Sequence, residues 1–77
     1  MVYIATFFTH YGALSFHNTL DTLQIQAKMM PVPRRLSSSC GTGVQFETDL
    51  EVESLANEDT DTIFLHQENE YTLVFEN

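Results

Sequence analysis

The sequence predicts a single α+β domain over residues 1–77, and three observations support this prediction. A length of 77 residues allows one domain. Apolar residues make up 43% of the chain and recur in short β-branched and aromatic runs, which is typical of strands in a folded protein. One longer segment instead repeats its apolar residues at helical spacing.

The first two expected elements are a strand and a helix. Residues 2–8 are short, β-branched or aromatic, and apolar on both faces, so we expect a central strand that is covered on both sides. Thr9 then offers an N-cap hydroxyl. The apolar residues that follow recur at spacings of three, four and three, which predicts a helix to about residue 23. Its expected buried face consists of Ala13, Phe16, Leu20 and Leu23.

The rest of the chain predicts four more strands and a second helix. The strands are expected at residues 26–30, 43–47, 62–66 and 71–75. Thr48 to Glu51 fits a capping box that would open a short acidic helix over residues 50–57. Its core-facing residues would be Val52, Leu55 and Ala56. The order β-α-β-β-α-β with an added C-terminal strand predicts a ferredoxin-like two-layer sandwich.

Charge excludes several classes of partner. The chain has three basic and eleven acidic residues, a net charge of −8, so no basic face exists that could neutralise nucleic-acid phosphates. An anionic membrane surface is excluded for the same reason. No apolar run approaches the roughly 18 residues of a bilayer span. The start of the chain lacks a basic signal region and there is one cysteine, so we expect a cytoplasmic protein.

The charge is also distributed unevenly. Ten of the eleven acidic residues lie after position 46, whereas the three basic residues, Lys28, Arg34 and Arg35, lie within eight positions immediately before the only cysteine, Cys40. This coincidence directs attention to the loop over residues 31–43, which is rich in proline, serine and glycine and joins two expected strands.

Cys40 is the candidate functional residue of this loop. A cysteine reacts as its thiolate, so groups that stabilise negative sulfur make it reactive. The groups expected to do so are Arg34, Arg35, Ser37, Ser38, Ser39, Gly41 and Thr42. A cysteine at a strand edge can instead turn into the core as a small hydrophobic residue. The polar and glycine neighbours of Cys40 favour the exposed, reactive thiol.

The sequence offers no motif for a metal, a cofactor or a catalytic triad. His10, His17 and His66 lie far from Cys40 in sequence, and no local signature pairs them with it. The first two histidines would be roughly 10.5 Å apart along a helix, which is too far for one ion. A zinc site of the Cys-x-x-Cys type, a calcium loop and a phosphate-binding P-loop are all excluded by pattern, so we expect neither a metal nor a cofactor.

Two stretches resemble the small bacterial family of selenium/sulfur (Se/S) carrier-like proteins. Residues 5–10, which lead into a Thr-His helix start, are similar to the family's opening. Residues 31–41 are similar to its Pro-Arg…Ser-x-x-Cys-Gly loop, in which Arg34, Ser37 and Gly41 match. The resemblance implies that Cys40 bears sulfur or selenium as a persulfide or selenosulfide, and that the partners are donor and acceptor proteins.

These observations support two candidate functions from different classes, a carrier protein and a binding protein. Both are favoured over a stand-alone enzyme. The first is a carrier of activated sulfur or selenium on Cys40. The alternative is a non-catalytic binding module that recognises a small anion or a partner protein through the Arg34–Gly43 loop. A self-contained redox cycle is excluded because there is no second cysteine. The expected last strand, residues 71–75, is available to pair with a second copy in a homodimer.

Overall fold

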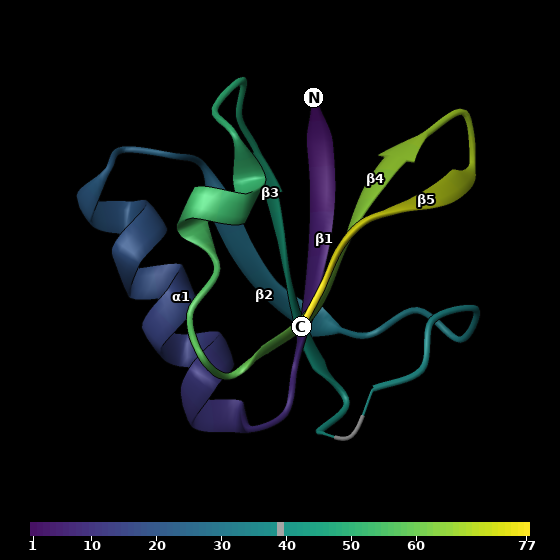
Figure 1. Ribbon diagram of the computed structural model, residues 1–77, viewed down its shortest axis with the longest axis horizontal. Helices are drawn as coiled ribbons and strands as arrows, with labels where there is room; N and C mark the ends of the chain where they lie inside the picture. The colour runs from purple at the N-terminus through teal and green to yellow at the C-terminus, as the bar shows by residue number, and fades with distance from the viewer. Residues whose placement is uncertain (39) are drawn as a thin grey trace.

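The computed structural model describes residues 1–38 and 40–77, and within them one helix packs on a face of a five-stranded sheet (Figure 1). The elements are β1 (Val2–Phe7), α1 (His10–Thr22), β2 (Ala27–Pro31), β3 (Thr42–Glu47), the 3₁₀ turn η1 (Val52–Leu55), β4 (Thr60–Gln67) and β5 (Glu70–Glu76). The strand order is β2-β3-β1-β4-β5, and every neighbouring pair is antiparallel. The predicted α+β class is confirmed.

The central position predicted for the first strand is confirmed. β1 pairs with β3 on one side and with β4 on the other, and residues 4–7 are all buried. Successive side chains of a strand point to opposite faces. Ala5 and Phe7 therefore face α1 and belong to the main core, whereas Ile4 and Thr6 face the other side of the sheet.

The helix begins where the sequence predicts. The Thr9 hydroxyl accepts a hydrogen bond from the Gly12 amide at 2.9 Å and caps α1. Three of the four residues expected on its inner face, Ala13, Phe16 and Leu20, are buried. The expectation for Leu23 is wrong, since it is 50% exposed. The helix ends one residue earlier, and the chain turns away there through a left-handed residue, Gln24, with φ of 62°.

Phe16 occupies the centre of the core between α1 and the sheet. Its ring centroid lies 5.1 Å from that of Phe7 on β1 and 5.3 Å from that of Phe46 on β3. Both pairs are tilted or edge-on, which is the favourable arrangement for aromatic rings. Phe46 and Val44 are buried, as predicted from the alternation of that strand. One aromatic side chain of α1 thus joins two strands of the sheet.

The predicted second helix is wrong, and the two-helix ferredoxin-like arrangement is not confirmed. The segment forms only η1, four residues of 3₁₀ helix. The connection must return along the length of β1, from the Glu47 end to the Thr60 end, in few residues. The Asn57 side chain also fixes a turn there, because its Oδ1 accepts from the Asp59 amide at 2.9 Å. The expected core contacts are confirmed, since Val52, Leu55 and Ala56 all pack against the core.

The face of the sheet opposite α1 is covered by the β2–β3 loop. Leu36 is the loop's buried apolar residue, 8% exposed, and it lines a depression together with Phe64, which pairs with Ile4 on β1. Leu36 follows a tight turn, in which its amide donates to the Pro33 carbonyl at 2.9 Å. Arg35, inside that turn, donates from its guanidinium to the Asn69 carbonyl of the β4–β5 hairpin at 2.8 Å. The loop is therefore fixed across the sheet.

We predict that Gly12→Ala destabilises the protein, although alanine is normally the better helix residue. A Cβ at Gly12 would overlap the Cβ of Asp59, which packs directly against the first turn of α1. The expected loss is about 1–3 kcal/mol of unfolding free energy, measured by urea denaturation. Asn18→Ala, at an exposed position of the same helix, is the matched control and should leave the midpoint unchanged or higher. An unchanged or raised midpoint for Gly12→Ala would contradict the close approach.

We also predict that the two adjacent arginines differ in their effect on stability. Arg35→Ala removes the bond to the Asn69 carbonyl and a cation–π contact 5.9 Å from the Tyr71 ring centre, so it should cost about 1 kcal/mol. Arg34→Ala is the control and should cost less than about 0.5 kcal/mol. Urea denaturation of both variants measures the difference. Equal losses would show that the Arg35 contacts do not hold the loop.

Candidate functional site

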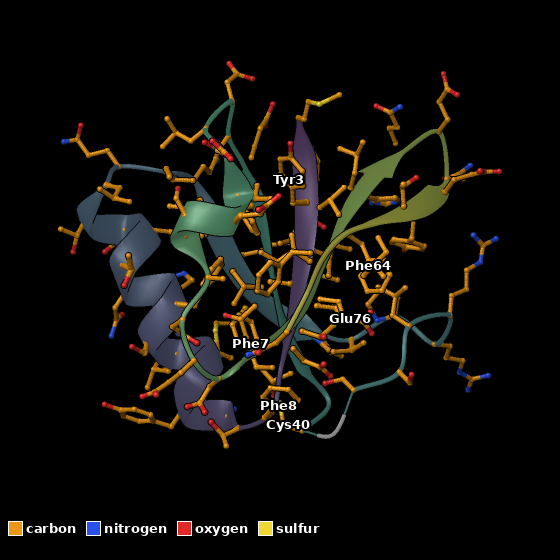
Figure 2. All side chains as sticks on the ribbon, in the orientation of Figure 1. Tyr3, Phe7, Phe8, Cys40, Phe64 and Glu76 are labelled. Carbon is orange, nitrogen blue, oxygen red and sulfur yellow. The ribbon has the colours of Figure 1, made fainter. Side chains whose placement is uncertain are left out.

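Cys40 lies at the base of the β2–β3 loop, two residues before β3 begins its pairing. The loop is closed there by the pairing of Pro31 with Thr42 and by the Val32 amide, which donates to the Gly41 carbonyl at 3.0 Å. The Cys40 side chain is half-buried and packs against the edge of the main core. Gly43 pairs with Thr6, so Cys40 lies toward the end of β1 from which the chain enters α1, where Figure 2 labels both Phe8 and Cys40.

The thiol has one described hydrogen bond within its own loop. Sγ of Cys40 donates to the carbonyl oxygen of Thr42, with a separation of 3.6 Å. Between them, Gly41 adopts a left-handed φ of 73°, which side-chain-bearing residues rarely adopt. Apart from its two chain neighbours, no heavy atom of residues 1–38 and 40–77 lies within 4 Å of a Cβ built on Gly41, so the described structure leaves open space beside Gly41. Glycine is thus required here by backbone conformation and not by crowding.

Thr42 connects the cysteine loop to the start of α1. Its carbonyl accepts from Cys40, and its hydroxyl oxygen lies 3.3 Å from Nδ1 of His10, the first residue of the helix. The N-terminus of a helix has partial positive charge from its unpaired amides. Thr42 therefore lies between the Cys40 thiol on one side and the His10 imidazole, at the N-terminus of α1, on the other.

His10 is the site residue that sequence reasoning missed. Separation in sequence hides the contact, because His10 and Thr42 are 32 positions apart and meet only through the pairing of β1 with β3. A signal for it did exist. The Thr-His helix start and the cysteine loop are the two stretches by which the chain resembles the Se/S carrier-like family.

The loop serines have different surroundings. Ser38 is half-buried and its hydroxyl donates to the Phe7 carbonyl at 3.3 Å, which ties the loop to the end of β1 near Cys40. Ser37 is exposed. The prediction for Ser39 falls on a position outside the described residues. Among the described serines, Ser38 is the one joined to the same end of the sheet as the thiol.

The two arginines expected to stabilise the thiolate lie near the β4–β5 hairpin. Arg35 contacts Asn69 and the Tyr71 ring, and Arg34 lines a shallow depression with the same two residues. The hairpin tip lies beyond the pairing of Leu65 with Tyr3, whereas Cys40 lies near Phe7, four residues or about 13 Å along β1. Neither arginine has a hydrogen bond or ion pair with Cys40 in the described part of the chain.

The other histidines have separate environments. Nε2 of His17 lies 3.3 Å from the Ala27 carbonyl, between α1 and β2. His66 stacks on Tyr71 with ring centres 4.4 Å apart. Across residues 1–38 and 40–77, no three histidine, cysteine, aspartate or glutamate side chains gather in a way that could hold a metal ion.

This arrangement suits covalent attachment of a small group to sulfur. Cys40 is a free, half-buried cysteine, a residue type that acts as a nucleophile when it is deprotonated, and the described structure leaves open space beside the next residue, Gly41. The described contact of His10 is with the Thr42 hydroxyl and not with Sγ, so the geometry differs from that of a thiol–imidazole hydrolase pair.

Comparison with known proteins identifies the family. No curated protein and no solved structure matches the chain. No helix in the described part of the chain is long and apolar enough to cross a membrane. The model of one protein family, described as "Putative Se/S carrier protein-like", matches residues 2–61 of the 77, a stretch that includes α1, the cysteine loop and the strands between them. The chain belongs to this Se/S carrier protein-like family.

Proposed function

We propose that this protein carries activated sulfur or selenium on Cys40, as a persulfide or a selenosulfide. The observation that supports the proposal best is the contact between the two stretches of the family resemblance. His10, at the helix start, lies 3.3 Å from the hydroxyl of Thr42, and the Thr42 carbonyl accepts from the Cys40 thiol. The family match over residues 2–61 covers both stretches.

The proposed reaction is a transfer of one sulfur atom without net oxidation. The Cys40 thiol first loses its proton to solvent, and the thiolate attacks the outer sulfur of a persulfide on the donor enzyme. The donor's S–S bond breaks and its own thiolate leaves, while a new S–S bond forms on Cys40. In the second half, a nucleophile of the acceptor attacks the outer sulfur on Cys40, and the Cys40 thiolate leaves. Selenium in the outer position would follow the same steps.

The surroundings of Cys40 suit both halves of this cycle. The open space at Gly41 allows a partner's sulfur to approach. His10 at the N-terminus of α1 lies one residue away from the thiol, because its ring contacts the hydroxyl of Thr42, whose carbonyl accepts from Cys40. The hydrogen bonds of Ser38 and of Val32 hold the loop in place, so little order has to form when a partner docks.

The test is sulfur loading by a cysteine desulfurase with cysteine as substrate, followed by intact-mass measurement. We expect the wild type to gain the mass of one sulfur atom and Cys40→Ser to gain nothing. Two oxygen atoms add nearly the same mass, so a sulfinic acid must be distinguished. Dithiothreitol removes a persulfide sulfur but leaves a sulfinic acid intact. A wild-type protein without any dithiothreitol-sensitive sulfur would refute the carrier function.

A second function, anion binding by the arginine turn, is favoured by a different observation. A shallow depression between this turn and the β4–β5 hairpin is lined by Pro33, Arg34, Arg35, His66, Asn69 and Tyr71, with no acidic side chain among them. Both arginines of the chain line this depression, while Glu68 and Glu70 line the adjoining one together with Arg35, Asn69 and Tyr71. We propose that it binds an oxyanion such as phosphate.

Point mutations distinguish this second function from the carrier function. In an NMR titration with inorganic phosphate, Arg34→Ala should weaken binding about tenfold, because one charge-assisted hydrogen bond is lost. Cys40→Ser should bind as the wild type does. Lys28→Ala, which removes the one basic residue outside the turn, is the matched control and should have no effect. No phosphate-dependent shift at residues 33–35, 66, 69 and 71 would exclude the anion site.

A further inference from the structure

Large apolar side chains are exposed at the end of the molecule where Cys40 lies. Phe8, Tyr11 and Leu14, here called the α1 apolar patch, are 43%, 75% and 45% exposed. Figure 2 labels Phe8 and Cys40 at the same end of the molecule. Tyr11 and Leu14 are three residues apart on α1 and therefore share one side of the helix. Two exposed apolar side chains that adjoin on a helix, with a third three residues before them in the chain, indicate a surface that another molecule covers.

Acidic residues lie beside the Phe8 end of this patch. The Phe8 amide donates to the Asp59 carbonyl at 2.9 Å, and the Asp59 carboxylate accepts from the Thr9 hydroxyl at 3.2 Å. Glu58, the next residue along, is exposed. The basic residues lie elsewhere, Lys28 on the edge strand β2 and the two arginines beside the β4–β5 hairpin. The patch is therefore apolar with a negative margin at its Phe8 end, and His10 precedes Tyr11 on the helix.

We infer that the α1 apolar patch is the docking surface for the enzyme that passes sulfur to Cys40, and that the matching surface of this enzyme is apolar with lysine or arginine at its margin. This inference rests on the proposed carrier function. A second copy of the chain would present the same acidic margin and a net charge of −8, so electrostatic repulsion disfavours it as the occupant. A basic margin would also accelerate the encounter.

The experiment compares sulfur transfer from two donors. One donor is a cysteine desulfurase with cysteine, which must dock to transfer sulfur. The other is inorganic polysulfide, from which the Cys40 thiolate takes a terminal sulfur and leaves a chain one sulfur shorter, without docking. The double variant Tyr11→Ser, Leu14→Ser should slow transfer from the desulfurase by about tenfold or more, because aromatic and apolar anchors dominate protein docking. Its rate with polysulfide should stay within about twofold of the wild type, since the reacting thiol is unchanged.

The matched apolar control is Leu23→Ser. Leu23 is 50% exposed at the opposite end of α1, so its replacement should leave both rates unchanged. If the wild type accepts sulfur from the desulfurase and the double variant accepts it equally fast, the docking surface is refuted while the carrier function stands. If the wild type takes no sulfur from the desulfurase, the carrier function itself is refuted. A loss shared by both donors would show damage at the thiol and would also refute docking through the patch.

The charge at the margin is tested separately. Glu58→Lys should slow transfer from the desulfurase severalfold, and the difference from the wild type should shrink as salt is added. Glu68→Lys, an equal charge change in the turn of the β4–β5 hairpin, should leave the rate within about twofold of the wild type. Equal slowing by the two variants would show that only net charge matters and would refute a basic partner surface at the patch.

Discussion

The sheet has two buried faces at its centre but only one helix to cover them, and this constraint shapes the candidate site. Ile4 and Thr6 of β1 are 1% and 0% exposed on the face away from α1. The apolar residue that reaches this side from the β2–β3 loop is Leu36, which lines the same depression as Phe64. The loop that contains Cys40 is therefore part of the fold. The burial of Leu36 and the hydrogen bond of Arg35 to Asn69 hold its first half against the sheet.

Two sets of contacts hold the two halves of this loop in different places. In the first half, Arg35 contacts Asn69 and Tyr71 of the β4–β5 hairpin. The second half returns to the end of β1, where Ser38 bonds to the Phe7 carbonyl and Thr42 contacts His10. The fixed positive charges are thus separated from the thiol. On this side of the loop, Thr42 lies between the Cys40 thiol and the His10 imidazole at the start of α1.

The parts of this structure that could be predicted are those set by neighbouring residues. The strands follow from local β-branched and aromatic runs, and the start of α1 follows from the Thr9 cap. The prediction of a second helix was wrong because the overall fold, and not local capping, determines how residues 48–59 return along β1. The His10–Thr42 contact and the direction of Arg35 depend on residues more than thirty positions apart. Neither has a local pattern, because strand pairing and loop packing create both.

A carrier must bind its partners and then leave them, and the surface around Cys40 fits that requirement. Cys40 is the only cysteine, so donor and acceptor would have to reach the same corner of the molecule in turn. Three exposed apolar residues form a small contact area, and small interfaces are typical of weak, transient complexes. Acidic neighbours mainly increase the encounter rate and do little to prolong the complex. Both features favour rapid exchange between partners, whereas a larger apolar surface would keep the donor bound and block the acceptor.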